Sequence, residues 1–268
     1  FIEKAIAISP ASSTMISLKG TILNAIGKKD EAIKVLKESI RYTYNYFDAW
    51  DKLFHLEGKE GLTTLTKLPD PVTLRDKALR WKEIDNENGS ILAFIKDIFF
   101  YPSRCFRERH FIMVYLSTQN AIDIWKEYVI SYNSYYQLVN ITKAYSINAG
   151  NKETPADINK NMAVFKSLQP GDAIVLEWTI ENHYQHDMAR QIWGEHDFSM
   201  PFPVYKTELR FVTPINDTIP YTVIGDSISR IRSTVDDFQI ITFSRDYYKN
   251  PSQESYALID PPNSDKIF

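Results

Sequence analysis

The single cysteine of the chain, Cys105, is the side chain best suited to nucleophilic chemistry. A cysteine nucleophile needs its thiolate form and a base within hydrogen-bonding reach. His110 is close in sequence, and Arg104 and Arg107 are cations that would lower the pKa of the thiol. On an extended strand, however, the five-residue separation places His110 about 17 Å away and on the opposite face. We therefore expect Cys105 to be structural, and a lone cysteine also excludes an internal disulfide.

A second set of candidate residues is rich in metal-ligand types and lies between residues 183 and 197. It contains His183, His186, His196, Asp187, Glu195 and Asp197. Imidazole and carboxylate groups suit zinc, but the spacing matches no zinc signature such as H-E-x-x-H. A polar loop between strands explains the same composition. We expect neither a metal nor another cofactor here.

Glu177 and Glu181 are a third candidate, because paired carboxylates can hydrolyse glycosidic bonds at defined separations. Their segment, Asp172 to Glu181, alternates apolar and polar residues, which is typical of a strand with one solvated face. The chain also lacks the G-x-S-x-G, P-loop and G-x-G-x-x-G patterns. We therefore expect no catalytic residue in this chain.

Large aromatic residues are a more promising signal for binding than for catalysis. A candidate recognition surface consists of Tyr132, Tyr135, Tyr136, Tyr184 and Trp193. Aromatic rings form platforms for sugars and peptides. The alternative is that these rings form cross-strand pairs and core contacts in a sheet.

The composition is that of an ordinary globular protein, with 44% hydrophobic and 24% charged residues. The formal net charge is −3, and no basic excess points to a nucleic-acid partner. No apolar run approaches the roughly 20 residues that cross a bilayer. The sequence opens at Phe1 inside a helical pattern, so we expect a piece of a larger protein whose export signal would lie outside it.

Residues 1–56 show helical periodicity with an internal repeat. Runs at 1–8, 13–26 and 31–42 are amphipathic, and Gly27 followed by Asp30 indicates a turn between two antiparallel helices. Ile2 and Leu36 lie 34 residues apart, as do Ile16 and Trp50. This period, with small residues at Gly20 and Ala32, resembles the tetratricopeptide repeat, although Tyr44 stands where proline is usual. The helices are either a spacer or scaffold, or a groove that binds a peptide.

The remaining sequence changes from helical to strand periodicity. After a break at residues 68–71, one more helix is predicted over residues 72–84 and ends at the turn before Gly89. Strands are predicted at 91–95, 98–101, 107–117, 122–132, 135–147, 173–180, 205–212 and 237–243. The predicted fold class is α+β with several domains: helical hairpins over 1–68, a linker helix over 69–88, and an antiparallel β-sandwich over 89–268.

The sequence from Val164 to Ile180 carries the most distinctive element, a leucine, then Pro170-Gly171-Asp172, then a strand. This element resembles DUF3857, a bacterial domain family that typically precedes a transglutaminase-like domain in exported proteins. The segments Trp125 to Tyr128, Trp193 to Phe198 and Pro201 to Val204 strengthen the resemblance, which covers about residues 90–268. The resemblance implies that the catalytic residues belong to the following domain.

Two functions are therefore expected for this chain. The first is a non-catalytic accessory or scaffold module of a periplasmic or envelope protein, which positions a transglutaminase-like domain and contacts a protein partner. The second is a stand-alone module of the cell envelope that binds a carbohydrate or a peptide. An enzyme in its own right is the least expected alternative.

Overall fold

The N-terminal helices pack as antiparallel neighbours in the structure, a computed structural model that describes residues 1–184, 194–225, 227–248 and 266–267. The helices are α1 (Ile2–Ile8), α2 (Ser13–Ala25), α3 (Lys29–Tyr42) and α4 (Phe47–Leu56). The Ser12 hydroxyl caps α2, and Gly27 provides the positive φ of 80° that turns the chain into α3. The predicted helical hairpin is therefore present.

Gly20 allows α2 and α3 to approach closely. A Cβ atom on Gly20 would lie 2.9 Å from Leu36 Cγ, which is closer than packed carbons allow. Ala32, one turn before Leu36 on α3, is fully buried. These small residues explain why the spacing in the sequence predicted a tight helix crossing.

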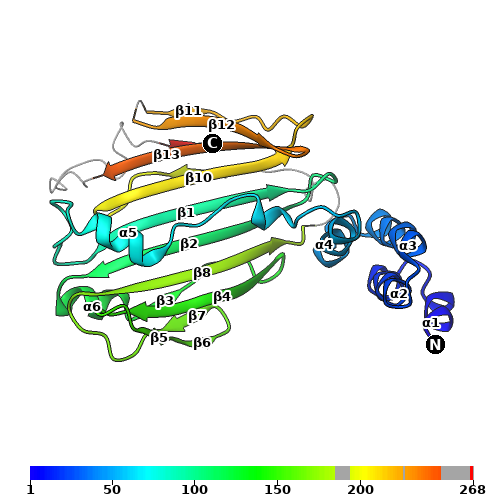
Figure 1. The fold of residues 1–268 in the computed structure, drawn as a ribbon, viewed down its shortest axis with the longest axis horizontal. Coiled ribbons are helices and arrows are strands. Elements are labelled where there is room, and N and C mark those ends of the chain that lie inside the picture. Colours follow the sequence, from blue (N-terminus) through cyan, green and yellow to red (C-terminus); the bar gives the residue numbers. More distant parts are fainter. Residues whose placement is uncertain (185–193, 226, 249–265, 268) are drawn as a thin grey trace.

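The rest of the chain forms a large, mostly antiparallel sheet (Figure 1). Its eight strands follow the order β12-β13-β10-β1-β2-β8-β4-β5, and only the β1–β10 pair is parallel among the described ladders of this sheet. Their bounds are β1 (Ser90–Phe100), β2 (Phe106–Leu116), β4 (Gln137–Ile147), β5 (Glu153–Pro155), β8 (Asp172–Asn182), β10 (Val204–Pro214), β12 (Ser229–Val235) and β13 (Phe238–Tyr248). This arrangement confirms the predicted α+β class, with helices first and a mostly antiparallel sheet after them.

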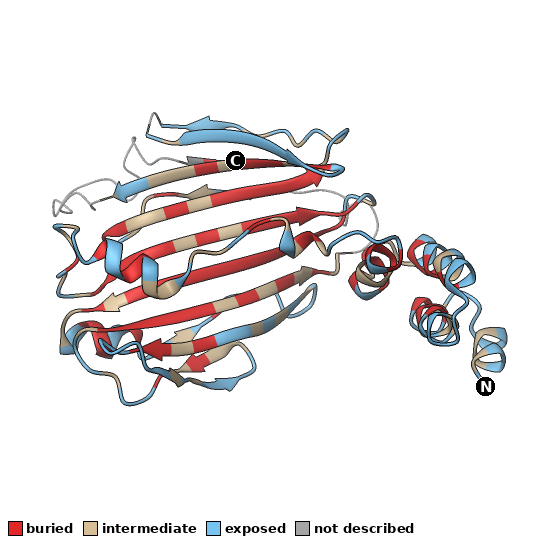
Figure 2. Ribbon diagram, in the orientation of Figure 1, coloured by how far each residue is buried: buried red, intermediate tan, exposed pale blue. Residues whose placement is uncertain are grey.

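Each face of this main sheet has its own cover. We call the side that bears Ile98, Ile112 and Trp178 the cavity face; it packs against α6 (Gln119–Trp125) and two small sheets. The small sheets are β3-β7-β6 and β11-β14-β9, with bounds β3 (Glu127–Val129), β6 (Asp157–Asn159), β7 (Met162–Val164), β9 (His196–Asp197), β11 (Val223–Ile224) and β14 (Lys266–Ile267). The opposite side, the α5 face, is crossed by η1 (Leu62–Thr64) and α5 (Pro71–Ala78). Figure 2 shows the central strands buried between these covers, whereas β12 is exposed along its length.

The predicted strand over residues 122–132 is wrong, because residues 122–125 belong to the helix α6 and only 127–129 form a strand. Thr118 caps this helix by accepting a hydrogen bond from the Ala121 amide at 3.0 Å. Ile122 and Trp125, three residues apart, are buried on one side of the helix, and Trp125 Nε1 donates to the Asn88 carbonyl. Tertiary burial thus overrides the strand preference of the β-branched and aromatic residues.

The turn that carries the family resemblance is formed as predicted. Gly171 has a φ of 99°, and the Asp172 carboxylate accepts a hydrogen bond from the Gln169 amide at 2.9 Å. The Gly171 amide donates to the Leu116 carbonyl, which ties the turn to β2. Within the described ranges, no helix combines the length and apolar character that a bilayer crossing requires.

Candidate functional site

A cavity of about 150 Å³ lies on the cavity face, between the main sheet and the small sheet β11-β14-β9. Apolar and aromatic side chains form much of its wall, including Ile98, Phe106, Leu209, Phe211, Ile219, Tyr221 and Ile267. The polar lining residues are Lys96, Glu108, Gln137, Asn182, Tyr184, Glu195 and His196. An apolar pocket with a few convergent polar groups is the usual form of a small-ligand site.

Strand alternation places the charged groups in this cavity. Lys96 and Ile98 on β1, and Phe106, Glu108 and His110 on β2, occupy every second position and therefore share one face. In the antiparallel register, Lys96 is opposite His110 and Ile98 is opposite Glu108. Charged residues thus occupy positions where the strand pattern would otherwise place core residues.

Glu108 is the centre of a buried hydrogen-bond network. Its carboxylate pairs with Lys96 Nζ at 2.9 Å and His110 Nε2 at 3.0 Å. Asn182 Nδ2 donates to the other carboxylate oxygen at 3.3 Å, and Gln137 Nε2 donates to Asn182 Oδ1 at 2.7 Å. Such a network fixes the orientation of each member because every buried polar group must find a partner.

The charge states follow from this network. Burial alone would raise the pKa of Glu108, but Lys96 and His110 outweigh it and hold that pKa well below its usual range. Burial lowers the pKa of His110, and the hydrogen bond to Glu108 only partly opposes this effect. Glu108 is therefore ionised at neutral pH beside Lys96. His110 stacks on the Trp178 ring, with the ring centroids 4.8 Å apart.

His196 brings a second imidazole to the cavity, from strand β9. Its ring lies parallel to the Phe94 ring, with the centroids 6.1 Å apart, and edge-on to the Phe198 ring, with the centroids 4.7 Å apart. Burial, together with the charge of Lys96 and the neighbouring His110, lowers the pKa of His196 to about 3. Its Nε2 atom is buried and has no hydrogen-bond partner among the described residues. One ring nitrogen of this imidazole is therefore buried without a partner among the described residues.

Cys105 lies outside this cavity, in a separate apolar cluster at the junction with the helices. Burial raises its pKa to about 12, and its sulfur contacts Ser103 Oγ at 3.1 Å and the Tyr44 carbonyl at 3.2 Å. A thiol with this pKa is protonated at neutral pH. His110 lies on the opposite side of the sheet, as the strand geometry predicted.

The predicted histidine and carboxylate set is only partly described, because His186 and Asp187 lie outside the described residues. His183 pairs with Glu181 at 3.3 Å and packs edge-on against Phe47, whereas His196 lines the cavity. In the part of the chain that the structure describes, no three metal-ligand side chains converge.

Glu177 and Glu181 both pair with cations on the α5 face of β8. Glu177 lies 3.2 Å from Lys143 Nζ, and Glu181 lies 2.7 Å from Arg107 Nη2. Glu181 has a lowered pKa because His183 and Arg107 outweigh the effect of burial. These two carboxylates therefore act as ion-pair partners in the structure.

The structure brings part of the predicted aromatic surface together. Tyr136 stacks on Tyr184 at 5.4 Å, and Tyr135 lies 6.5 Å from Tyr136 with 90% of its surface exposed. Tyr132, three residues before Tyr135 in the sequence, is half-buried. Trp193 lies outside the described residues. Tyr184 also lines the cavity, so this tyrosine cluster borders it.

Sequence reasoning missed Lys96, Glu108 and the role of His110. The available signal was the presence of three ionisable residues at inward positions of two apolar strands. A buried charge needs a partner, so such positions predict either a structural ion pair or a site.

A second buried network, on the α5 face, is structural. Asp97 is fully buried and accepts hydrogen bonds from Arg109 Nε at 2.9 Å and Arg210 Nε at 2.6 Å. The same two arginines donate to the carbonyls of Thr63, Thr66 and Lys67. They therefore hold the segment that crosses the sheet before α5.

Comparison with known proteins shows the fold but no family. No family model matches the chain, and the search of curated proteins found no match. A solved structure of a proposed protease from Parabacteroides distasonis ATCC 8503 superposes with a TM-score of 0.60 at 13% identity, over 67% of this chain and 39% of that one. A two-domain M1 zinc metallopeptidase superposes with a TM-score of only 0.33 at 10% identity, over 66% of this chain and 41% of that one, and we draw no conclusion from it. The chain thus shares its fold with part of a larger protein of which it spans well under half.

Proposed function

We propose that this chain is a non-catalytic accessory module that positions a transglutaminase-like domain of the same polypeptide, with its N-terminal helices contacting a protein partner. Two points support the proposal: the DUF3857-like element around Pro170 to Asp172, and the shared fold with part of a proposed protease. Tetratricopeptide-like packing of α2 and α3 is compatible with a partner surface.

The observation that carries this proposal is the firm junction between α4 and the main sheet. Phe47, Trp50 and Phe54 of α4 pack with Tyr101 and Phe238 of the sheet domain, with ring centroids 5.3–6.2 Å apart. A module that positions other domains needs such a fixed connection, because a flexible linker would leave their orientation free.

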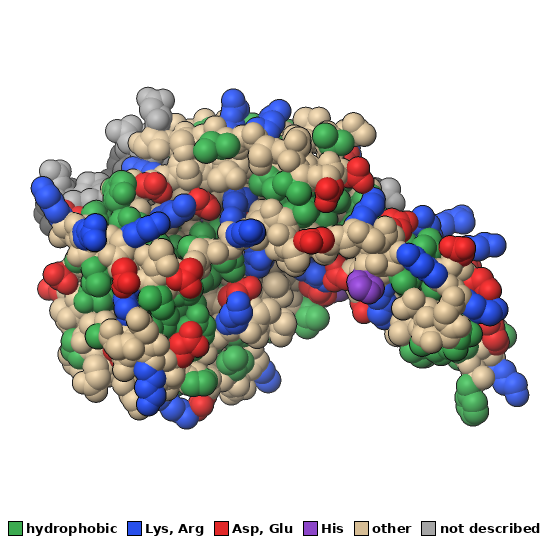
Figure 3. All heavy atoms as spheres, in the orientation of Figure 1, with side chains coloured by type: hydrophobic (Ala, Val, Ile, Leu, Met, Phe, Trp, Pro, Cys, Tyr) green, Lys and Arg blue, Asp and Glu red, His purple; other side chains and the backbone are tan. Residues whose placement is uncertain are grey.

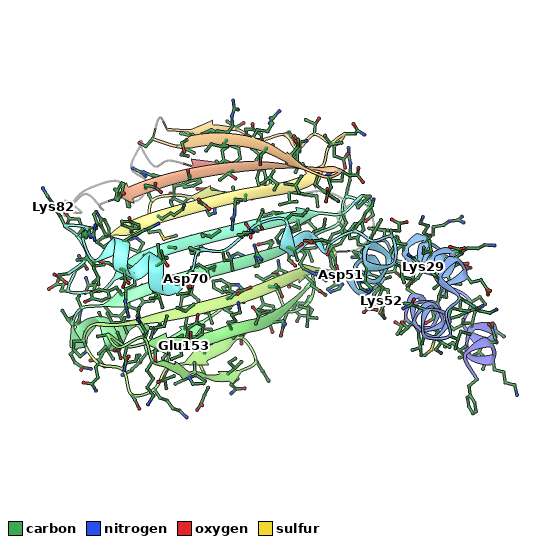
Figure 4. The ribbon with its side chains drawn as sticks, viewed as in Figure 1. Lys29, Asp51, Lys52, Asp70, Lys82 and Glu153 are labelled. Carbon is green, nitrogen blue, oxygen red and sulfur yellow. The ribbon has the colours of Figure 1, made fainter. Side chains whose placement is uncertain are left out.

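Ion pairs fix the orientation of the same junction. Arg107 on β2 pairs with Asp51 on α4 at 2.9 Å, and the Tyr101 hydroxyl donates to Asp51 at 3.0 Å. Figure 4 labels Asp51 at the end of the sheet where α4 joins it. The Arg107 guanidinium also lies over the Phe47 ring, at 5.1 Å from its centroid.

The test uses the full-length product of the native gene. Acyl-transfer activity is measured as incorporation of a fluorescent amine into casein, and amide hydrolysis as release of peptides from casein. Trp50→Ala with Phe54→Ala loosens the junction, and we expect a several-fold loss of activity in the folded protein. The matched control is Tyr42→Ala on the exposed surface of α3, which should retain full activity.

Cys105→Ser separates the positioning role from a catalytic one. Because Cys105 is buried beside Ser103, we expect full activity in this variant. The proposal fails if Cys105→Ser abolishes activity, if the junction variant is fully active, or if the gene encodes no transglutaminase-like domain.

The same family resemblance leads us to propose a periplasmic or envelope location. A fusion of the native N-terminus and this chain to alkaline phosphatase tests it, since that enzyme is active only after export. An inactive fusion of normal abundance would overturn the proposal.

A second candidate function is a stand-alone binding module, and the specific observation that favours it is the cavity bordered by the tyrosine cluster. Tyr136 and Tyr184 are stacked, and Tyr184 lines the cavity together with Gln137 and Asn182. Binding by this chain alone, without any following domain, would distinguish this function from the first.

A further inference from the structure

Strand β12 forms an open edge of the main sheet. It is the terminal strand in the order β12-β13-β10, and all seven of its residues are exposed (Figure 2). One side of this strand pairs with β13, and its other side has no neighbouring strand in the described part of the sheet. An open edge offers backbone N–H and C=O groups to an additional strand.

The pairing with β13 determines which backbone groups of β12 point away from the sheet. The Asp237 carbonyl accepts a hydrogen bond from the Ile215 amide, just beyond β10, at 2.8 Å. Because backbone groups alternate in direction along a strand, those of the next residue, Phe238, point toward its β12 partner Val235. The same alternation along β12 gives the outward-pointing groups, which belong to Arg230, Arg232 and Thr234.

Two arginines of β12 lie on the cavity face of the sheet. Arg230 is opposite Phe243 and Arg232 is opposite Ile241, and both of these β13 residues belong to the cluster on that face. Arg230 Nη1 donates to the Tyr221 hydroxyl at 3.0 Å. Neither arginine has a carboxylate partner among the described residues, so both charges are available to an anionic group.

Apolar residues of β12 lie on the opposite face, the α5 face. Ile231 is 64% exposed and Val235 is 39% exposed. Ile231 is opposite Thr242 on β13, two positions away from the arginine partners in direction though adjacent in sequence. A strand added at this edge would cover these apolar side chains with its own.

We propose that β12 binds an extended segment of a partner protein in which acidic and apolar residues alternate. The segment adds a strand to the main sheet and bonds to the outward-pointing backbone groups of β12. Its acidic side chains lie beside Arg230 and Arg232, and its apolar side chains lie beside Ile231 on the other face. This edge lies outside the cavity lining and the helices, so the inference goes beyond both proposed functions and depends on neither.

Charge favours an acidic partner over a second copy of this chain. β12 contains no carboxylate, so a second β12 offers none to Arg230 and Arg232 and instead brings its own arginines close to them. The opposite edge of the sheet lacks this pattern. β5 has only three residues, and Lys143 on the neighbouring β4 already pairs with Glu177.

The binding test uses the intact 268-residue chain and fluorescence anisotropy of fluorescein-labelled hexapeptides. The probe, Thr-Glu-Val-Glu-Val-Thr amide, has both glutamates on one face when it is extended. The control peptide, Thr-Glu-Glu-Val-Val-Thr amide, has the same composition but directs its glutamates to opposite faces. We expect saturable binding of the probe and about fivefold weaker binding of the control peptide, because a cross-strand ion pair is lost.

Charge reversal assigns the binding to β12. Arg230→Glu with Arg232→Glu should lower the affinity for the probe about tenfold and should raise the affinity for Thr-Lys-Val-Lys-Val-Thr amide. The matched control is Lys34→Glu with Arg41→Glu, which reverses two exposed cations on α3 and changes the net charge equally. This control variant should bind the probe as the parent does.

Methylation of the peptide backbone tests strand addition itself. Antiparallel addition uses the amides of the two glutamates in the probe, whereas parallel addition uses the amides of the two valines. N-methylation of one pair should therefore abolish binding, and N-methylation of the other pair should leave it.

The inference is overturned by the absence of saturable binding at millimolar probe, which would show that the arginines only protect the edge. Equal binding of the probe and the control peptide, unchanged affinity in the β12 variant, or equal effects of the two methylation patterns would also overturn it. A dimer of the chain alone that the probe disrupts, measured by sedimentation, would assign the edge to a second copy. Circular dichroism of each variant confirms that it is folded before affinity is compared.

Discussion

Buried ionic residues sit on both faces of the main sheet, and their partners give them different roles. Asp97 on the α5 face is fully enclosed by two arginines that also bind backbone carbonyls. Glu108 on the cavity face has a lysine, a histidine and an amide as partners, and a cavity lies next to it. The first network holds a chain segment, whereas the second lies in the wall of a cavity.

Asp97→Asn tests the structural network. The change keeps the side-chain volume but leaves two buried arginines without their shared anion, which we expect to cost about 3–5 kcal/mol of unfolding free energy. The measurement is urea denaturation followed by tryptophan fluorescence. Glu153→Gln on the exposed strand β5 is the matched control and should leave the midpoint nearly unchanged. An Asp97→Asn variant as stable as the parent would show that the arginines find other partners.

His196 gives stability a defined pH dependence. Because burial among Lys96 and His110 lowers its pKa to about 3, the unfolded chain binds more protons than the folded one between about pH 6.5 and 3. Stability therefore falls as the pH drops through this window, with a contribution from His196 of at most about 1.4 kcal/mol per pH unit. The lowered pKa of His110 acts in the same direction over its own range, and that of Glu108 does so below its ordinary value.

The check is a series of urea denaturations between pH 4.5 and pH 7.5. His196→Phe should reduce the slope of unfolding free energy against pH below pH 6.5, whether or not it changes the unfolding free energy at pH 7.5. Tyr135→Ala should show the parental slope. A His196→Phe variant with an unchanged slope would mean that this imidazole titrates normally in the folded protein.

At the scale of single elements, the correct predictions came mostly from the alternation of apolar and polar residues in strands and from the residue types of turns. The strands β2, β4 and β8 and the turn at Pro170 to Asp172 were predicted close to their observed positions. Alternation also placed Cys105 and His110 on opposite faces. These features depend on local backbone geometry, so the sequence reports them directly.

The features that could not be predicted from the sequence depend on contacts between distant segments. β12 was not predicted, and residues 90–100 form one strand where two were predicted. The cavity needs the register of β1 with β2, and also β14, which inserts between β9 and β11. Ile267 of β14 pairs with His196 in sequence-distant β9, and no local pattern encodes that pairing. The residues Lys96 and Glu108 could therefore be noticed as unusual, but not joined into a site.

The Thr118 cap of the helix α6, which stands where a strand was predicted, can be tested by mutation. Thr118→Ala removes the capping bond to the Ala121 amide, and we expect a loss of about 1 kcal/mol. Asp123→Ala on the exposed side of the same helix is the control and should have little effect. Hydrogen exchange of the residues 119–125 should rise in Thr118→Ala only. Equal exchange in both variants would show that packing of Trp125 alone holds this helix.

At the scale of the whole molecule, the arrangement of helices and sheet bears on the positioning role that we propose. Figure 3 shows Lys, Arg, Asp and Glu side chains intermixed over the visible face, without a large field of one sign. The helices α1 to α3 project from one end of the sheet domain, beyond the α4 junction (Figure 1). A projecting helical unit on a firm base exposes its surface to partners while its orientation stays fixed.

Trp50→Ala tests whether helices and sheet fold as one cooperative unit. Trp50 is 8% exposed, its ring lies 5.9 Å from that of Tyr101, and its Nε1 donates to the Tyr44 carbonyl. Truncation of a buried tryptophan costs about 3–5 kcal/mol because it removes contacts and leaves a cavity. If this junction couples the two parts, α2 to α4 should exchange amide hydrogens well before the main sheet in the variant.

Hydrogen exchange with mass spectrometry measures this uncoupling segment by segment. In the parent, the helices and β1 should share the slowest, global opening, whereas in Trp50→Ala only the strands should retain it. Tyr42→Ala, an exposed position on α3, should keep the parental pattern. Helices that already exchange independently in the parent would contradict the coupling, and with it the fixed orientation that a positioning module requires.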